Sequence, residues 1–349
     1  MSSELPPTTP TSASRATTLL TIAARGVVAA EFRPLLPGRP LLPVLHARRL
    51  CSRAIVSCMD GVLPFDVDAY QSLLTTRVIG RRIDCHATTP STMTLSDERM
   101  RLEGAAAAHG SIILAEKQTA GVGRRGRSWE SPPDGNLYFS LLWTPVSAGT
   151  PAPSSPMELL PRLTQLNLAA SVAIVAAAES VGVSSCRIKW PNDVWAGAPA
   201  PRKLSGTILN FDGTSGAVLG VGINVLQDLS SNETATSLRS LRAASAASSA
   251  APAVSREAVL ANFCAQLERL MALPIEAVLD EYRTHDLLLG RTIRVHHRTR
   301  EETDPKDFDA EARGVDREGQ LRVLPKLGGA ERVLSGEEVS ISPLDLADK

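Results

Sequence analysis

The sequence has no excess of charge of either sign, because Lys plus Arg and Asp plus Glu both number 37 among its 349 residues. This balance excludes a global field that would draw the protein to nucleic acid or to an anionic membrane, so any basic function must be local. Aromatic residues are only 4% of the chain, too few for an extended platform that stacks bases. We therefore expect neither a nucleic-acid partner nor a membrane partner.

Cysteine and long apolar runs are also scarce. The five cysteines are scattered, odd in number and without a CxxC pair, which favours a reducing compartment and argues against a zinc site. No uninterrupted apolar run reaches the roughly 18 residues that a membrane helix needs. These absences predict a soluble, intracellular protein, with the cytoplasm as its expected location.

The first 63 residues differ in composition from the rest. Residues 1–60 hold seven arginines, no lysine, and only Glu4, Glu31 and Asp60 as acids. An Arg-rich, hydroxyl-rich and acid-poor segment suits mitochondrial targeting. Repeated prolines interrupt any amphipathic helix there and favour a disordered extension instead. Both interpretations stay open. Nothing in this segment resembles a helix-turn-helix.

A mixed α+β domain is expected at 64–288, and a small all-β barrel at 289–349. Apolar runs at 111–116 and 136–143 predict strands, and "KLSGTILNFDGTSGAVLGVGINV" predicts a hairpin that turns at Asp212-Gly213. Helices are predicted after a Ser91 or Thr92 N-cap and over 163–181, 255–273 and 275–288. Flexible inserts are expected near 146–160 and 240–254. Without regular βαβ alternation, a doubly wound parallel sheet is not expected.

A turn-prone stretch rich in arginine and glycine follows the first of these apolar runs. Residues 121–126 have the GxGxxG spacing of dinucleotide-binding loops, but the Pro-rich segment 131–135 follows where such a loop needs a helix. A P-loop is excluded because no GK[ST] follows. The stretch therefore offers backbone N–H groups and three fixed cations, Arg124, Arg125 and Arg127, whose guanidinium groups match phosphate and carboxylate oxygens. A solvated basic loop is the alternative.

Three further polar clusters stand beside predicted strands: "KWPND" (189–193), "RKLSG" (202–206) and "GVGIN" (220–224). Taken singly, each has an ordinary structural explanation, such as an Asx turn or a lysine that points to solvent. Together they place anion-handling and metal-capable groups around one sheet.

Five stretches resemble, in order, the successive motifs of biotin protein ligases, also called holocarboxylase synthetases: "KQTAGVGRRGRSW", "NLYFSLLW", "RIKWPNDVW", "RKLSGTIL" and "GVGINV". The segment "ARGVDREGQLRVL" is similar to the SH3-like barrel that closes these enzymes. The resemblance covers the chain from about residue 80 to its end. It implies a catalytic domain like that of class II aminoacyl-tRNA synthetases, followed by the barrel.

The resemblance implies a two-step reaction. Biotin and ATP give biotinyl-5′-AMP and pyrophosphate, and the biotinyl group then passes to a lysine of the biotin carboxyl carrier domain of a carboxylase such as acetyl-CoA carboxylase. The first step brings a carboxylate against a triphosphate, and two like charges about 4 Å apart cost about 4 kcal/mol at an effective dielectric near 20. Cationic side chains and Mg²⁺ are therefore expected where the two substrates meet.

Residues carry over from the matching motifs. The expected catalytic residues are Lys203, Arg124, Asp193 and Lys189. The expected biotin-binding residues are Ser91, Thr92, Gln118, Gly121, Arg124, Lys203 and Gly206. The expected ATP-binding residues are Arg124, Arg125, Arg127, Trp129, Lys189, Asn192 and Asn224. Asp193 is expected either to bind Mg²⁺ or to orient the attacking amine.

Two residues depart from the family pattern. Met93 stands where the family commonly has Asn, so one polar ligand of the biotin head is absent, and Val122 stands where bacterial members commonly have Arg. Both departures bear on affinity for biotin and not on the reaction itself. A lipoate–protein ligase is the alternative function, although the arginine loop and the terminal barrel favour biotin. We expect no operator-DNA binding, and either a monomer or a weak homodimer.

Overall fold

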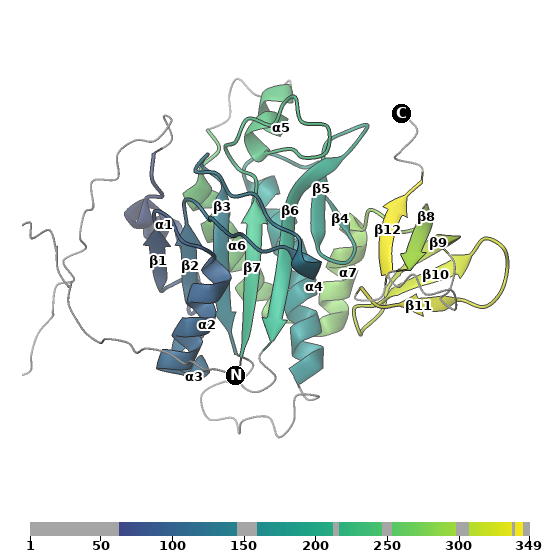
Figure 1. Ribbon diagram of the computed structural model, residues 1–349, viewed down its shortest axis with the longest axis horizontal. Helices are drawn as coiled ribbons and strands as arrows, with labels where there is room; N and C mark the ends of the chain where they lie inside the picture. The colour runs from purple at the N-terminus through teal and green to yellow at the C-terminus, as the bar shows by residue number, and fades with distance from the viewer. Residues whose placement is uncertain are drawn as a thin grey trace, which may run out of the picture. The chain divides into compact units, whose positions relative to one another are not determined.

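The computed structural model describes residues 63–144, 159–211, 216–245, 253–297, 307–336 and 339–344. A seven-stranded mixed sheet forms the first part of this structure (Figure 1), in the order β1-β2-β3-β7-β6-β5-β4. Its strands are β1 (Ile83–His86), β2 (Ile112–Ala115), β3 (Leu137–Trp143), β4 (Arg187–Lys189), β5 (Asp193–Ala196), β6 (Arg202–Phe211) and β7 (Ala217–Ile223). Only β1 and β2 pair in parallel; every other neighbouring pair in this sheet is antiparallel.

Helices cover both faces of this sheet, so its central strands β3 and β7 are buried along their whole length. The larger core forms where α4 (Leu160–Ser180), α6 (Arg256–Met271) and α7 (Ile275–His285) pack together and onto the strands. A smaller core of Ala108, Ile113 and Leu142 lies where α2 (Thr92–Glu103) and α3 (Ala105–Ala108) meet the sheet. The successive residues of β2 alternate between these two cores, as the period of a strand requires.

Local sequence explains where the main helices begin. Ser91 caps α2 by accepting a hydrogen bond from the Met93 amide, and Ser255 caps α6 by accepting one from Ala258. Helix α4 is apolar nearly all round, because it is rich in alanine and packs against strands β4, β5 and β6 on one side and helices α6 and α7 on others. It is long and apolar enough to span a bilayer by length and composition, but most of it is buried inside this fold.

A second sheet of five antiparallel strands follows α7, in the order β11-β10-β9-β8-β12. The strands are β8 (Thr292–His297), β9 (Phe308–Val315), β10 (Leu321–Pro325), β11 (Arg332–Leu334) and β12 (Val339–Pro343). Alternate residues such as Ile293, Val295 and Val323 are buried on one face. The predicted α+β class with a mixed sheet is confirmed, and the sheet-rich C-terminal part agrees with the expected all-β segment.

Three elements were not predicted: α1 (Val67–Leu73), β5 and α5 (Leu238–Ala244). Each is short, and α1 depends on a cap from Asp66 rather than on a long periodic pattern. The proposed N-terminal extension up to residue 62, the turn at Asp212-Gly213 and most of the insert expected at 146–160 lie outside the described residues. Of the insert expected at 240–254, residues 246–252 also lie outside them, whereas helix α5 covers 240–244. The domain boundaries therefore stay predictions.

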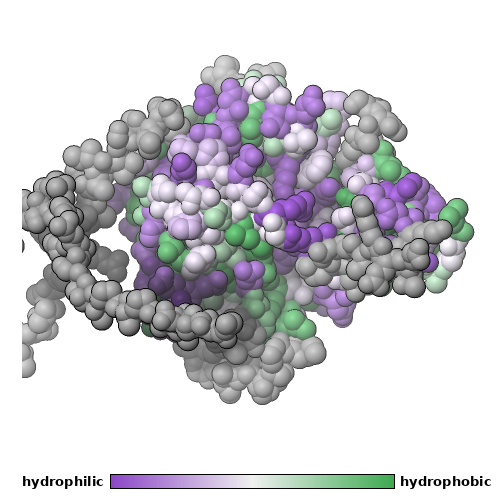
Figure 2. Space-filling view, viewed as in Figure 1, coloured by the Kyte–Doolittle hydropathy of each residue, from purple (hydrophilic) through white to green (hydrophobic). Residues whose placement is uncertain are grey.

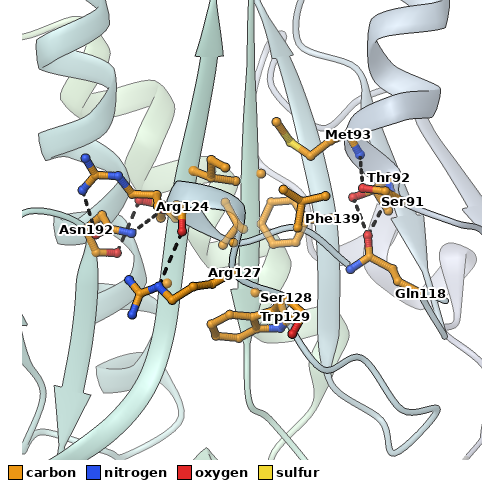
Figure 3. Close-up of a pocket in the computed structure, with 18 of the residues that line it drawn as sticks. Ser91, Thr92, Met93, Gln118, Arg124, Arg127, Ser128, Trp129, Phe139 and Asn192 are labelled. Atoms are coloured by element: carbon orange, nitrogen blue, oxygen red, sulfur yellow. Dashed lines mark hydrogen bonds between the residues drawn. The ribbon is translucent and has the colours of Figure 1, made fainter. Parts of the chain in front are cut away.

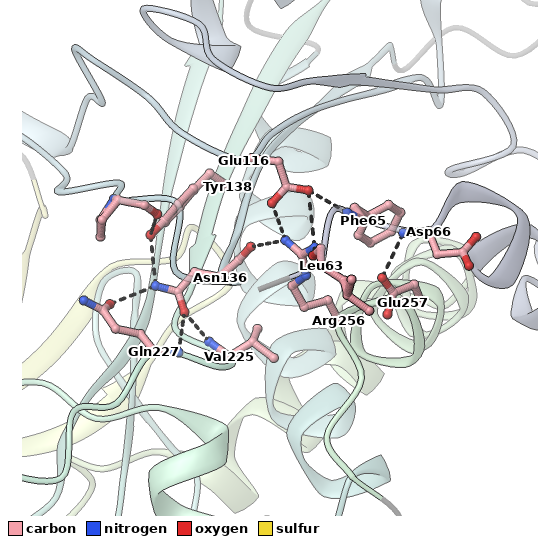
Figure 4. Close-up of polar contacts among 11 residues, drawn as sticks. Leu63, Phe65, Asp66, Glu116, Asn136, Tyr138, Val225, Gln227, Arg256 and Glu257 are labelled. Atoms are coloured by element: carbon pink, nitrogen blue, oxygen red, sulfur yellow. Dashed lines mark hydrogen bonds and ion pairs between the residues drawn. The ribbon is translucent and has the colours of Figure 1, made fainter. Parts of the chain in front are cut away.

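A buried ion pair holds residues 63–65 against the sheet (Figure 4). The guanidinium of Arg256, on α6, donates to the Glu116 carboxylate at 2.6 Å and to the Leu63 carbonyl at 2.8 Å. The same carboxylate accepts the backbone N–H of Phe65 at 2.6 Å. The Arg256 side chain is only 3% exposed, so its charge is shielded from water. The Glu116 carboxylate compensates this buried charge. Residues 63–65 are thereby held against the end of β2.

Candidate active site

A short hairpin carries the arginines that follow β2, and we call residues 121–129 the flap. The Gly123 amide donates to the Arg127 carbonyl at 2.7 Å, and the Trp129 amide donates to the Gly121 carbonyl at 2.9 Å. At its tip, the 3-10 turn η1 (Arg124–Gly126) places Arg125 in the left-handed region, with φ of 65°. Gly121 allows the two arms to meet, because a Cβ there would lie 2.3 Å from the Trp129 carbonyl oxygen.

The two neighbouring arginines at the flap tip have different surroundings. Arg124 donates to the Asn192 side-chain oxygen at 3.1 Å and to the Gly336 carbonyl at 3.3 Å. Arg125 donates to the carbonyls of Gly336, in the β11–β12 connection, and of Val339, the first residue of β12. Figure 2 shows a strongly hydrophilic patch near the centre of this face, over the region where the turn of residues 124–126 crosses the sheet in Figure 1.

Strands β5 and β6 bring a lysine and an aspartate together. The Lys203 ammonium lies 2.9 Å from the Asp193 carboxylate, and both side chains are partly exposed. A register shift between Val194 and Trp195 sets Asp193 opposite Gly206, on the strand that also carries Lys203. A Cβ at Gly206 would lie 3.1 Å from the aspartate oxygen and 3.2 Å from the lysine nitrogen, so the missing side chain leaves room for the pair.

A hydrogen-bonded polar group forms the opposite end of the site (Figure 3). The Gln118 side-chain oxygen accepts the Thr92 amide at 2.9 Å, and its nitrogen donates to the Ser131 hydroxyl at 2.9 Å. The Thr92 and Ser140 hydroxyls lie 2.7 Å apart. Ser91 stands beside Thr92 as the N-cap of α2. These groups offer donors and acceptors that a small polar ring system could share or replace.

The floor between these two ends is apolar and rich in glycine. A Cβ at Gly220 would lie 2.5 Å from the Met93 sulfur, and one at Gly222 would lie 2.4 Å from the Trp129 ring. Both large side chains therefore rest directly on the backbone of β7. The Lys203 ammonium lies 5.1 Å from the centre of the Trp129 ring, within cation–π range.

Together these groups line one cavity of about 130 Å³. Its lining comprises Ser91, Thr92, Met93, Gln118, Val122, Gly123, Arg124, Arg127, Ser128, Trp129, Phe139, Asn192, Asp193, Lys203, Gly206, Thr207, Ile208, Gly220, Val221 and Gly222. Ten residues expected from the sequence are thus brought together: Ser91, Thr92, Gln118, Arg124, Arg127, Trp129, Asn192, Asp193, Lys203 and Gly206. Their roles toward biotin and ATP stay predictions.

Four expected site residues do not line this cavity. Gly121 forms the base of the flap, and Arg125 is directed to the β11–β12 connection. Lys189 lies against Trp195, with its ammonium 4.4 Å from the ring centre, and burial lowers its pKa although nearby Asp193 opposes that shift. The Asn224 side-chain nitrogen donates to the Thr236 carbonyl at 3.0 Å.

Several lining residues had not been assigned to the site from the sequence. Phe139 and Ile208 read as ordinary strand residues, and Gly220 and Gly222 read only as small residues near the ring. Met93 and Val122, which had been noted as departures from the family pattern, both line the cavity. The sequence signal for Val122 is an apolar residue inside an Arg/Gly loop, and the structure leaves its side chain 46% exposed.

Comparisons with known proteins define the class. The model of the biotin/lipoate A/B protein ligase family matches residues 86–228. A biotin–[acetyl-CoA-carboxylase] ligase of Mycobacterium tuberculosis is 30% identical over 266 residues, which cover 74% of this chain and 88% of that protein. The bifunctional ligase/repressor BirA of Escherichia coli is 26% identical over 243 residues, covering 66% of this chain and 68% of that protein.

A solved structure supports the same fold. The biotin protein ligase of Aquifex aeolicus, determined in complex with biotin and ATP, superposes with a TM-score of 0.55 over 75% of this chain and 99% of that one. At 22% sequence identity this likeness establishes the fold alone. Fold and site thus define a member of the biotin/lipoate ligase class. Within that class, the chain belongs to the biotin protein ligase family.

Proposed function

We propose that this chain is a biotin–protein ligase that works in two steps. In the first step, a biotin carboxylate oxygen attacks the α-phosphorus of ATP and pyrophosphate leaves, giving biotinyl-5′-AMP. In the second step, the amine of a carrier-domain lysine attacks the biotinyl carbonyl, AMP leaves, and an amide bond forms. The acceptors are biotin carboxyl carrier domains of carboxylases such as acetyl-CoA carboxylase.

One observation carries the proposal: three cationic side chains line the same cavity as a polar hydrogen-bonding group. Arg124, Arg127 and Lys203 are at one end, and Thr92 and Gln118 are at the other. A molecule with a polar ring and a carboxylate tail matches this order of groups. The cations then lie where the carboxylate meets a triphosphate, and they offset the repulsion between the two anions.

Lys203 is the residue best placed to stabilise charge at the reacting centre. Its ammonium already lies beside one carboxylate, that of Asp193, at the cationic end of the cavity. A bound substrate carboxylate or α-phosphate would compete for the same ammonium. We propose that Lys203 turns from Asp193 toward the substrate oxygen during adenylation, at a point where negative charge accumulates.

The site fits Mg²⁺ only with the help of substrate oxygens. Among the described residues, no group of three or more His, Cys, Asp and Glu side chains could hold a metal ion. Mg²⁺ commonly takes one or two carboxylates and completes its shell with phosphates and water. Asp193 is the cavity carboxylate that would hold it, and the ion would then supply charge neutralisation at the phosphates. The alternative role of Asp193, orienting the attacking amine, belongs to the second step.

The flap has a separate role in this proposal, which is to exclude water from the mixed anhydride. Arg124 reaches Asn192 in one direction and the Gly336 carbonyl in the other. These bonds, together with those of Arg125, can hold the flap over the cavity. The flap therefore does not need all of its arginines to bind the ligand. A closed flap protects biotinyl-5′-AMP from hydrolysis until a carrier lysine arrives.

The proposal is tested by incubating the full chain with MgATP and either biotin or lipoate and measuring pyrophosphate. Intact-mass spectrometry of an added carrier domain then reports the transferred group. We expect pyrophosphate release and a biotinyl adduct with biotin, and neither with lipoate. Release and transfer with lipoate alone would replace the proposed substrate by the alternative one.

Location and assembly are further proposals. We propose a cytoplasmic or, through the Arg-rich N-terminal segment, mitochondrial enzyme that acts as a monomer or weak homodimer without nucleic-acid or membrane partners. Deleting residues 1–60 should spare catalysis and change only location. The ligase activity of the truncated chain, measured with the assay above, tests this part of the proposal.

A further inference from the structure

Asn136 is a buried hydrogen-bonding centre outside the cavity (Figure 4). It stands one residue before β3 and is 1% exposed. Its side-chain nitrogen donates to the Tyr138 hydroxyl and to the Gln227 side-chain oxygen, both at 2.9 Å. Its side-chain oxygen accepts the amides of Val225 at 2.8 Å and Gln227 at 3.4 Å. Both the donor and the acceptor capacities of one amide are thus used.

One branch of this network leads to the flap. The Tyr138 hydroxyl, which accepts from Asn136, donates in turn to the Pro132 carbonyl at 3.2 Å. Pro132 lies three residues after the end of the flap, on the arm by which the flap rejoins β3. Burial raises the pKa of Tyr138, so its hydroxyl keeps its proton and remains a donor. Tyr138 is 1% exposed, and water does not compete readily for this bond.

The other branch leads to the segment that follows β7. The Gln227 carbonyl accepts the Ser237 hydroxyl at 2.6 Å. Between them the chain runs beside Lys203, whose amide donates to the Thr234 carbonyl and whose carbonyl accepts the Thr236 amide, both at 2.9 Å. The segment 225–237 therefore borders the backbone of the residue that we place at the reacting centre.

We propose that Asn136 is a positioning residue that fixes the flap and the segment 225–237 relative to each other. The inference rests on the proposed function, because the two parts matter together only when a ligand lies between them. An amide suits the position: aspartate would lose both donated bonds, and leucine would leave two backbone amides unsatisfied. Asn136 does not line the cavity, so it acts on a bound ligand through Tyr138 and Gln227.

The test uses a variant at the end of each branch together with a matched control. Tyr138→Phe removes the hydroxyl that reaches Pro132, and Gln227→Ala removes the acceptor on the other side. Tyr282→Phe is the control, because its hydroxyl is also buried but has no hydrogen-bond partner among the described residues. For each full-length protein, the rate of biotinyl-5′-AMP formation, the half-life of the bound intermediate and Tm are measured.

We expect Tyr138→Phe and Gln227→Ala each to shorten the half-life of bound biotinyl-5′-AMP about fivefold, the effect of one buried hydrogen bond. The rate of its formation with saturating substrates should change less than twofold, and Tyr282→Phe should match the wild type. The double variant Tyr138→Phe/Gln227→Ala should lose less than the product of the single effects, because both changes act through one amide.

Two results would overturn the inference. One is a wild-type half-life in both single variants, measured well below their Tm. The other is full multiplicativity in the double variant, which would make the two branches independent. Failure of the proposed function itself is distinct, since the wild-type protein would then release no pyrophosphate with biotin and MgATP. If one single variant does not fold, the other branch still carries the half-life test.

Discussion

The Lys203 ammonium and the Asp193 carboxylate lie 2.9 Å apart on adjacent strands, in the cavity that Arg124 and Trp129 also line. The pair is partly exposed, so its contribution to the free energy of unfolding is small. The position of the pair matters more than its contribution to stability. The Lys203 ammonium, which is held beside one carboxylate, can also bind the carboxylate of a substrate. Asp193 also adds a negative charge to a cavity that three cationic side chains line.

Replacing Lys203 should abolish most of the chemistry without disturbing the fold. Lys203→Ala is expected to lower the rate of biotinyl-5′-AMP formation by two or more orders of magnitude, because the developing negative charge loses its closest ammonium. Pyrophosphate release at saturating biotin and MgATP measures this rate, and Tm checks the fold. Lys326→Ala, on the β10–β11 connection away from the cavity, is the matched control. Activity of Lys203→Ala within threefold of wild type would remove Lys203 from the reaction.

Arg124 should control retention of the intermediate. Arg124→Gly removes the guanidinium that donates to the Asn192 side chain and to the Gly336 carbonyl, so the flap loses both of these hydrogen bonds. We expect biotinyl-5′-AMP to escape at least tenfold faster and to label lysines on bystander proteins. Mass spectrometry of added serum albumin provides the readout. An intermediate held as tightly as in the wild type would contradict the assigned role of Arg124.

Arg125 should act on flap attachment rather than on substrate. Its φ of 65° is one that glycine adopts freely, so Arg125→Gly removes the guanidinium without adding backbone strain. The loss of its bonds to the Gly336 and Val339 carbonyls should make trypsin cleave after Arg127 about tenfold faster. The KM for ATP should change less than in Arg124→Gly. A larger rise in KM for ATP in Arg125→Gly than in Arg124→Gly would restore Arg125 as an ATP ligand.

Stability should depend on pH through Asp286, at the end of α7. Burial raises the pKa of this carboxyl to about 6 from an ordinary 3.8, although a bond from the Leu288 amide opposes the shift. Between pH 4 and pH 6 the folded chain keeps a proton that the unfolded chain releases. The free energy of unfolding therefore falls as pH rises through that window, by about 3 kcal/mol in total, and levels off above it.

Asp286→Asn should remove this dependence, because the amide oxygen can still accept the Leu288 N–H and no charge is buried. Relative to the wild type, the variant should gain about 2–3 kcal/mol more at pH 8 than at pH 4 in urea unfolding. Equal differences at the two pH values would show that Asp286 titrates normally.

The α+β class and most of the helices followed from the sequence, because their signals are local. Ser91 and Ser255 cap helices where an N-cap residue precedes a periodic run, and the apolar segment at 163–181 forms a buried helix. The short elements α1, β5 and α5 were missed because four to seven residues carry too little periodicity.

Partners at long range could not be predicted. The motifs placed Arg124, Asn192 and Lys203 in one site, but no pattern indicated that Arg124 reaches Gly336, 212 positions away. The same limit hid Asn136, whose side-chain oxygen accepts from backbone amides about 90 positions later in the chain. From the sequence alone, a residue in a predicted strand is interpreted as part of the core. Only the structure shows which residues its side-chain amide connects.

The most direct test of the account is a crystal structure of this chain with biotinyl-5′-AMP bound. We expect the phosphate oxygens within hydrogen-bond distance of the Lys203 ammonium and the Arg124 guanidinium, the biotin ring against Thr92 and Gln118, and the Lys203–Asp193 contact lengthened. An adenylate bound elsewhere, with Lys203 still paired to Asp193 at 2.9 Å, would contradict the central claim that this cavity is where the two anions react.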